Sequence, residues 1–343
     1  MTRYIIRRLL QAIPLLLFIS IMIFVLANAM GDPLASFGGR RRIRSSDRER
    51  LTRQLGLDKP ITVQYVVWLI GNDWMDIDLD GDGVAEVKGS RKGVLRGDWG
   101  KSFMEKRPVS KLIAERLPNT LLLMLVSEIV IIIFSLIIGI YSALKQYTVT
   151  DHAITGLSFI GYSMPIFWIA LMLMYLLAVK FKQWGLPYFP TVGKYDLSVG
   201  PTIEQVAWHM VLPVASISII SIAAYTRYIR SSMLEVINED YIRTARAKGL
   251  TERTILFRHA LKNASLPLIT LIGLDLPLLL SGAVLTESIF AWPGMGRLFW
   301  NAAQDTDIPV LMGVLMLISV AVVVFQIITD IVYTFLDPRI HYD

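Results

Sequence analysis

Long apolar runs recur along this chain, and several exceed the roughly 20 residues that a helix needs to cross a hydrocarbon core. Hydrophobic residues make up 54% of the sequence, more than a soluble fold requires. Polar or helix-breaking residues bound each run, which places six spans at 9–30, 119–144, 153–181, 209–233, 266–289 and 308–336. The sequence therefore predicts an all-α integral membrane protein with six transmembrane helices.

Basic residues set the expected orientation of these spans. Three arginines precede the first span, and the segment 238–265 between the fourth and fifth spans is also rich in arginine and lysine. Because short cytoplasmic loops carry an excess of such residues, both termini and this segment are expected in the cytoplasm. The arginines at 40–53 then lie outside, but an insert longer than about 60 residues crosses the membrane largely regardless of its charge.

Three parts of the chain follow from this topology. Residues 1–30 are expected to form the cytoplasmic N-terminus and first span, 31–117 a soluble extracytoplasmic insert, and 118–343 a five-helix core. The first apolar run, about 18 residues long, exceeds the usual length of about 7 to 15 in a secretory signal, so it is expected to be retained. An apolar and aromatic patch at 63–70 is expected to pack against the outer ends of the spans.

Charge and cysteine content exclude other classes of function. The formal net charge is +6, but the basic residues cluster beside apolar spans, where they meet lipid headgroups, so no nucleic-acid partner is expected. The sequence contains no cysteine, which removes disulfides, thiolate nucleophiles and sulfur-ligated metals.

The segment 238–265 predicts two polar helices rather than a passive connector. Asn238 is expected to cap the first helix, whose acidic residues fall in the first turn and whose basic residues fall in the last turn. Gly249 is expected to end this helix, and Thr251 to cap a second helix that stops before Pro267.

Residues 241–249 resemble the cytoplasmic coupling loop of permeases of binding-protein-dependent ABC importers. Arg243, Thr244, Ala245 and Gly249 match its Glu-Ala-Ala-x-x-x-Gly core, with arginine in place of glutamate. That arginine and the long interval to Pro267 are similar to the dipeptide, oligopeptide and nickel branch. Further segments that agree with this branch are 116–120, 161–168 and 287–296.

The resemblance implies a type I ABC importer permease-like fold in a prokaryotic plasma membrane. It also implies a second permease, two cytoplasmic ATPase subunits and an extracytoplasmic solute-binding protein as partners. The residues expected to engage the ATPase are Tyr241, Arg243, Thr244, Ala245, Lys248 and Gly249. Peptides are the expected solute, and oligosaccharides and nickel stay open within the branch.

No nucleotide site or catalytic motif is expected in this chain itself. Gly100-Lys101-Ser102 imitates the end of a phosphate-binding loop, but Leu95 stands where that motif needs glycine. The four histidines lie outside hydrolase motifs. The chain is therefore predicted not to be an enzyme, and ATP hydrolysis is expected on a separate chain.

An acidic loop in the insert predicts a structural calcium ion. Carboxylates at alternate positions wrap several oxygens around a hard cation, and calcium accepts six to eight of them. The ligands expected from this pattern are Asp78, Asp80, Asp82, Glu86 and the carbonyl of Val84. A solvated acidic turn is the alternative.

Charged residues within the spans mark candidate positions on the path of the solute. A carboxylate at mid-bilayer costs at least about 2.5 kcal/mol unless a partner or a water-filled path relieves it. Asp275 and Glu287 are the two path candidates, and a pair between Asp275 and Arg227 is the structural alternative. An autonomous ion-gradient transporter or channel is the second functional hypothesis; it predicts helix breaks at the membrane midplane and an inverted repeat. A calcium-responsive scaffold is a third.

Overall fold

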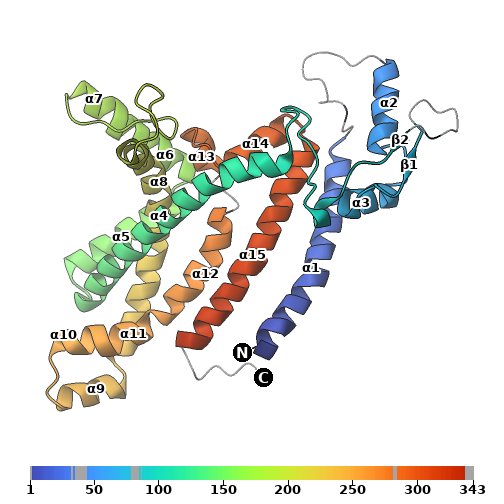
Figure 1. Ribbon diagram of the computed structural model, residues 1–343. Helices are drawn as coiled ribbons and strands as arrows, with labels where there is room; N and C mark the ends of the chain where they lie inside the picture. The colour runs from blue at the N-terminus through green and yellow to red at the C-terminus, as the bar shows by residue number, and fades with distance from the viewer. Residues whose placement is uncertain are drawn as a thin grey trace. The chain divides into compact units, whose positions relative to one another are not determined.

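The computed structural model describes residues 2–31, 34, 45–78, 85, 87–280 and 284–336. The chain divides into two compact units, Met1–Pro118 with Leu298–Ala321, and Asn119–Arg297 with Val322–Asp343. Three helices continue from one unit into the other: α4 (Val109–Leu144), α14 (Met295–Gln304) and α15 (Ile308–Leu336). Figure 1 shows the elements with their labels.

The first unit begins with the long helix α1 (Thr2–Ala29), which contains the first predicted span. It is followed by α2 (Ser45–Leu55), α3 (Ile61–Ile70), the short strands β1 (Asp76–Ile77) and β2 (Val87–Lys88), and the 3₁₀ turn η1 (Val94–Arg96). Strands β1 and β2 pair antiparallel, with Ile77 opposite Val87. The chain turns after α2 because Gly56 adopts a φ of +71°, which favours glycine.

Aromatic side chains of α3 form the core of the first unit together with α1. The ring of Tyr65 meets Phe24 edge-on at 5.4 Å, and the ring of Trp68 lies 5.8 Å from Phe24. The Tyr65 hydroxyl is also 2.8 Å from the hydroxyl of Ser20. The apolar patch at 63–70 therefore packs against the end of a span, as the sequence predicts.

The segment that imitates a phosphate loop is tied to the start of α15. The Ser102 hydroxyl donates a hydrogen bond to Asp307, and the N–H groups of Phe103 and Met104 donate to the same carboxylate. Asp307 is only 3% exposed, so its charge is compensated by these donors. This hydroxyl therefore has a structural role.

The second unit contains the remaining helices. They are α5 (Val149–Ser163), α6 (Ile166–Leu173), the π-helix η2 (Met174–Lys180), α7 (Phe181–Gln183), α8 (Ile203–Ile237), α9 (Asp240–Ala247), α10 (Glu252–Thr254), the π-helix η3 (Ile255–Ala260), α11 (Leu261–Ala264), α12 (Leu266–Leu280) and α13 (Val284–Ile289). Helix α8 is central, because α5, α6, α11 and α12 all pack against it.

The predicted span at 153–181 is divided into two helices, and the expectation of one uninterrupted span is wrong at this point. Met164 is extended, with a ψ of 135°, and α6 begins after Pro165. Proline disfavours the helical conformation of the residue before it and lacks the N–H that continues a helix. Pro165 therefore predicts the break between the two helices, but the sequence analysis placed one span here because the apolar run is continuous across it.

In the described part of the chain, five helices are long and apolar enough to cross a membrane, at Ile6–Ala29, Val109–Leu144, Ile166–Gln183, Ile203–Ile237 and Ile308–Val332. The fifth predicted span, 266–289, corresponds to the shorter apolar helix α12 followed by α13. The fold is thus mostly helical with several apolar spans, and α15 has the predicted bounds.

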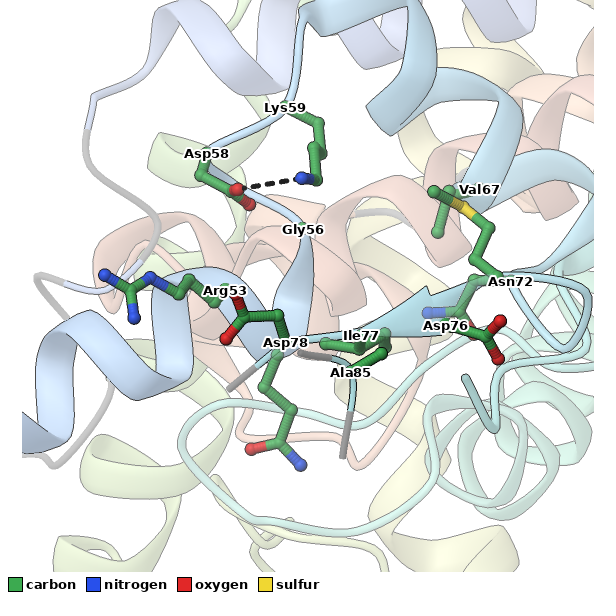
Figure 2. A pocket seen from close by; sticks show the side chains of 12 residues that line it. Arg53, Gly56, Asp58, Lys59, Val67, Asn72, Asp76, Ile77, Asp78 and Ala85 are labelled. Atoms are coloured by element: carbon green, nitrogen blue, oxygen red, sulfur yellow. Dashed lines mark ion pairs between the residues drawn. The ribbon is translucent and has the colours of Figure 1, made fainter. Parts of the chain in front are cut away.

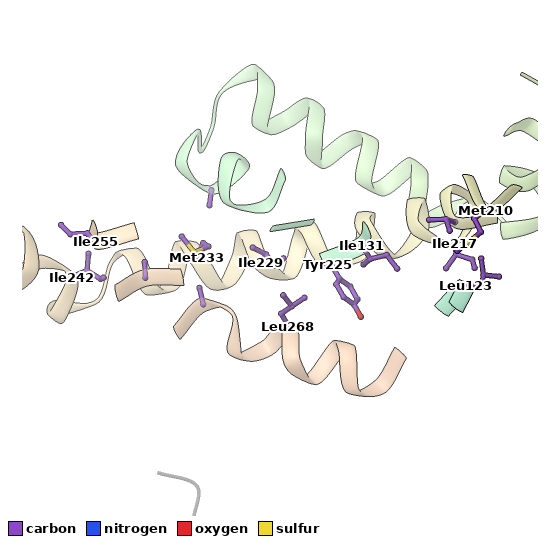
Figure 3. Close-up of a cluster of buried hydrophobic side chains, with 14 of the residues drawn as sticks. Leu123, Ile131, Met210, Ile217, Tyr225, Ile229, Met233, Ile242, Ile255 and Leu268 are labelled. Atoms are coloured by element: carbon purple, nitrogen blue, oxygen red, sulfur yellow. The ribbon is translucent and has the colours of Figure 1, made fainter. Parts of the chain in front are cut away.

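The core of the second unit follows α8 along its length. Figure 3 shows Tyr225, Ile229 and Met233 of α8 in one row of buried side chains, with Ile242 and Ile255 at one end of the row. Because the same cluster contains residues of α9 and η3, the segment after α8 is packed onto the helical bundle.

Candidate functional site

The segment between α8 and α12 begins with helix α9, but its start differs from the prediction. Asn238 does not cap α9, because α8 continues to Ile237, beyond the predicted end of the span. The Asn238 side chain instead donates to the carbonyl of Leu234 at 2.8 Å and closes the end of α8. Glu239 stands before α9 without a side-chain capping bond.

The end of α9 agrees with the prediction. Gly249 has a φ of +76°, a conformation that glycine adopts without strain, and a Cβ at this position would meet no atom within 4 Å. The Thr251 hydroxyl accepts a hydrogen bond from the N–H of Thr254, which caps the second helix as expected.

An ion pair bridges the turn between α9 and α10. Nε of Arg246 lies 2.8 Å from the carboxylate of Glu252. The hydrogen bond from this guanidinium lowers the pKa of Glu252 below its ordinary value. Both side chains are largely exposed, so the pair adds little stability, but it closes the turn around Gly249.

Helix α9 has one buried side and one exposed side. Ile242 is 0% exposed and Ala245 is 6% exposed, and both belong to the core cluster that includes Ile255 of η3. Ala245 is one of the predicted coupling residues, and its side chain contacts its own chain here. Residues three apart share one face of a helix, as Ile242 and Ala245 do, whereas neighbours in the sequence point in different directions, so Thr244 and Ala245 of the same motif lie on different sides.

The exposed side of α9 carries the other predicted coupling residues: Tyr241, Arg243, Thr244 and Lys248. The Arg243 side chain is 72% exposed and only weakly paired with Asp240, at 3.5 Å. The Tyr241 hydroxyl accepts a hydrogen bond from the side-chain amide of Asn263 at 2.8 Å, which fixes the ring against the second helix. The structure thus brings a positive charge, an aromatic ring and small polar groups onto one free surface.

Three polar residues meet inside the second unit, where α4, α8 and α12 come together. The Tyr225 hydroxyl donates to Oδ2 of Asp275 at 2.8 Å. Glu128 is 4% exposed, and neither of its carboxylate oxygens has a hydrogen-bond partner among the described residues. The pair between Asp275 and Arg227, which was the structural alternative to a path role, does not form in this structure. The Arg227 guanidinium lies over aromatic rings instead.

Glu287, the other path candidate, is fully buried at 0% exposure. Its carboxylate accepts hydrogen bonds from the Thr120 hydroxyl at 2.8 Å and from the N–H of Arg297 at 3.0 Å. Gly294 leaves the space that this carboxylate fills, because a Cβ there would lie 2.3 Å from Oε1. In this conformation the buried Glu287 carboxylate therefore serves as a hydrogen-bond acceptor inside the chain and does not line an exposed surface.

Two segments singled out by the resemblance lie against each other. The side-chain amide of Asn119 donates to the carbonyl of Pro293 at 2.8 Å, and its backbone carbonyl accepts from the indole of Trp292 at 3.0 Å. Asn119 also accepts a hydrogen bond from Lys194 at 2.7 Å. The resemblance singled out the segments 116–120 and 287–296, but the sequence did not indicate that they contact each other.

A buried ion pair that the sequence analysis did not identify joins α5 to α8. Asp151 is 1% exposed, and its two carboxylate oxygens lie 2.7 Å from Nε and from Nη2 of Arg230. The Ser142 hydroxyl and the N–H of Tyr147 donate to the same carboxylate. These donors, led by the guanidinium, hold the pKa of Asp151 well below its usual value.

The acidic loop of the insert falls only in part within the described residues. Asp78 follows β1, while Asp80, Asp82, Val84 and Glu86 lie outside the described residues. In the part of the chain that the structure describes, no group of three or more His, Cys, Asp or Glu side chains is placed to hold a metal ion. The calcium ion therefore stays a prediction.

A pocket of about 330 Å³ lies beside the first strand of this hairpin. Figure 2 shows its lining, which includes Arg53 from α2, Asp76 and Asp78, and the ion pair between Asp58 and Lys59 at 3.3 Å. Charges of both signs meet there, so the pocket selects neither anions nor cations by charge alone.

Comparison with known proteins assigns the chain to a family. The sequence profile of "Binding-protein-dependent transport system inner membrane component" matches residues 135–342, and the profile of its N-terminal part matches residues 1–124. The oligopeptide transport system permease protein AppB of Bacillus subtilis is 43% identical over 100% of both chains. The dipeptide transport system permease protein DppB of Escherichia coli (strain K12) is 36% identical over 100% of this chain and 99% of its own.

A solved structure supports the fold. The inward-facing MetNI methionine ABC transporter has a chain that superimposes with a TM-score of 0.52 at 15% identity, over 66% of this chain and 96% of that one. The expected partners are those of this class of transport system: a second permease, ATPase subunits and a solute-binding protein. The protein therefore belongs to the family of inner membrane components of binding-protein-dependent transport systems, as a multi-pass permease subunit of an ATP-driven importer whose ATPase is a separate chain.

Proposed function

We propose that this permease carries peptides that a solute-binding protein delivers. The support is the similarity, over the whole chain, to permeases named for oligopeptide and dipeptide transport. The test is uptake of labelled peptides by the complete importer in proteoliposomes, with nickel and an oligosaccharide as competing solutes. Uptake of nickel or oligosaccharide without uptake of peptide would contradict the proposal, and uptake without ATP would favour the gradient-driven alternative.

The single observation that carries the proposed mechanism is the two-sided helix α9. Its exposed side, with Tyr241, Arg243, Thr244 and Lys248, engages a groove of the ATPase, while Ile242 and Ala245 anchor it to η3 and thus to α8. Movement of the ATPase then moves the helical bundle. A shift of the bundle from 1:99 to 99:1 between two access states requires the ATPase to prefer one state by about 5.5 kcal/mol.

Surface substitution on α9 tests this mechanism. Arg243→Glu reverses an exposed charge without touching the buried side, so it is expected to lower ATP-driven uptake while the permease still assembles. Glu204→Lys changes an exposed charge at the far end of α8 and is the matched control. Normal uptake and normal ATPase association in Arg243→Glu would contradict a role for this surface.

The proposed topology has six crossings, with both termini and the α9 segment in the cytoplasm and the insert outside. α5 and α6 together make the third crossing, and α12 with α13 makes the fifth. The chain has no native cysteine, so single cysteines introduced at Arg243 and at Lys88 report each side directly. A membrane-impermeant maleimide is expected to label intact cells at position 88 only. Labelling at position 243 instead would invert the topology.

We also propose a structural calcium ion bound by Asp78, Asp80, Asp82, Glu86 and the carbonyl of Val84. The support is the sequence pattern together with the antiparallel pairing of Ile77 with Val87, which shows that the loop joins two strands of a hairpin. Calcium titration of the purified full-length protein should give a dissociation constant of about 0.1 to 1 mM. Asp80→Asn should abolish this signal, whereas Asp58→Asn should not.

A further inference from the structure

Arg227 places a guanidinium over two aromatic rings of a neighbouring helix. Its Cζ lies 5.0 Å from the ring centroid of Phe159 and 4.9 Å from that of Tyr162. Both rings belong to α5, whereas Arg227 belongs to α8. Aromatic rings attract a cation through their quadrupole and hold the planar guanidinium in a fixed orientation.

This guanidinium lacks an acidic partner among the described residues. Two acids of the same unit are bonded elsewhere: Asp275 accepts a hydrogen bond from Tyr225, and Asp151 pairs with Arg230. Nε of Arg227 is buried and has no hydrogen-bond partner in the described part of the chain. The aromatic rings offset part of the positive charge, but they accept few hydrogen bonds from the five N–H groups of the guanidinium. Arg227 therefore keeps N–H donors that an anion could accept from.

The direction of the Arg227 side chain argues against a lipid headgroup as its partner. Asp151 marks the end of α5 that lies near the α9 segment, because it pairs with Arg230 and contacts the turn after α4. Phe159 and Tyr162 lie about 12 and 16 Å further along α5, by the helical rise. Arg227 thus reaches into the span, whereas an arginine that seeks headgroups reaches outward.

The rings that hold Arg227 are not covered by this chain. The side chains of Phe159 and Tyr162 are each 54% exposed in the isolated chain. An isolated charge inside a span is costly unless it faces a partner or a water-filled path, and such a residue marks a functional site by default. Arginine recognises carboxylates through two parallel hydrogen bonds, and its ring-stacked plane leaves its edge free for this geometry.

We propose that Arg227, held by Phe159 and Tyr162, binds the carboxylate of the transported solute during its passage. This inference rests on the proposed peptide function, because a peptide brings a free C-terminal carboxylate. The site would favour peptides with a free carboxylate over peptides whose C-terminus is amidated.

The test measures uptake of one dipeptide and of its C-terminal amide by the complete importer in proteoliposomes. The solute-binding protein is saturated with each peptide, so that its own preference does not enter the comparison. Arg227→Gln is expected to lower uptake of the free dipeptide about tenfold and to leave uptake of the amide unchanged, because one charge-assisted contact is lost. Arg227→Lys, which keeps the charge, should retain part of the preference.

Lys182→Gln is the matched control, because Lys182 also lies over an aromatic ring, 5.1 Å from the centroid of Tyr188, but on another segment. It should leave both uptake rates unchanged. If Arg227→Gln does not assemble, Tyr162→Leu provides the same comparison and is expected to lower the preference about threefold, since one of two rings is lost.

Three outcomes would overturn the inference. The first is that Arg227→Gln lowers uptake of the free dipeptide and of its amide equally. The second is that neither Arg227→Gln nor Tyr162→Leu lowers uptake of the free dipeptide. The third is that the decrease in uptake depends on anionic lipid in the vesicles instead of on the peptide carboxylate. If the unsubstituted importer carries neither peptide, the proposed function itself fails. If wild type and variants take up both peptides at the same rate, the proposed peptide function stands and only the role of Arg227 is contradicted.

Discussion

Asp151 and Arg230 form a two-pronged ion pair that fastens the start of α5 to α8, with both nitrogen to oxygen distances at 2.7 Å. The carboxylate is almost completely buried and also receives hydrogen bonds from Ser142 and Tyr147. Helix α8 leads directly into α9, so this pair joins the turn after α4 to the helix that carries the proposed coupling surface.

Removal of one member of this pair should destabilise the protein strongly. Asp151→Ala leaves Arg230 without its partner, and loss of one partner from a buried pair costs about 3 to 5 kcal/mol. Arg246→Ala breaks the exposed pair with Glu252 and should cost about 0.5 kcal/mol or less. Thermal unfolding of both variants in detergent measures the contrast, and similar midpoints for the two would contradict it.

The same pair predicts a pH dependence. Because the folded state holds the pKa of Asp151 below its ordinary value of about 3.8, the pair contributes stability above that pH and loses it as the pH falls toward the folded pKa. The stability difference between wild type and Asp151→Asn should therefore stay constant from about pH 8 to pH 5 and shrink below about pH 4. Unfolding midpoints across this range measure it; a difference that grows at acid pH would contradict the assignment.

Gly249 should tolerate asparagine better than valine. Its φ of +76° is accessible to glycine and asparagine but costs a branched side chain about 1 to 2 kcal/mol, and a Cβ at this position meets no atom within 4 Å. Gly249→Val should lower ATP-driven uptake while ATP hydrolysis continues, because the turn that positions α9 is strained. Gly249→Asn should keep most uptake. Equal behaviour of the two variants would show that the turn conformation is unimportant for coupling.

Gly294 should not accept even a methyl group. A Cβ would lie 2.3 Å from Oε1 of Glu287, a buried side chain that cannot move away without losing its bond to Thr120. Gly294→Ala should cost about 1 to 3 kcal/mol through overpacking. Gly156→Ala on α5, where a Cβ meets no atom within 4 Å, should be neutral or stabilising. Unfolding midpoints compare the two, and a neutral Gly294→Ala would contradict this packing.

Local signals in the sequence predicted the long helices and several of their ends. Apolar runs placed the spans, and Gly249 and Thr251 end and begin helices as expected. The prediction that Asn238 caps α9 was wrong because α8 extends past its apolar run to Ile237. Hydropathy carries no information about the length of a helix beyond its apolar run.

The contacts that define the candidate sites had no such local signal. The partners Asp151 and Arg230, like Thr120 and Glu287, are far apart in the sequence and meet only because their helices pack together. A single charged residue gives no indication of which distant residue compensates it. The face of α9 that carries Ala245 was likewise fixed by packing on η3 rather than by its motif.

Asp275 offers the last prediction, because asparagine at this position keeps the acceptor for the Tyr225 hydroxyl and removes only the charge. We expect Asp275→Asn to assemble normally and to change the rate of uptake. Tyr225→Phe removes the donor and leaves a carboxylate without its bond inside the bundle, which should cost about 1 to 3 kcal/mol of stability. Uptake by proteoliposomes and unfolding midpoints separate the two effects. Unchanged uptake in Asp275→Asn would reduce Asp275 to a purely structural residue.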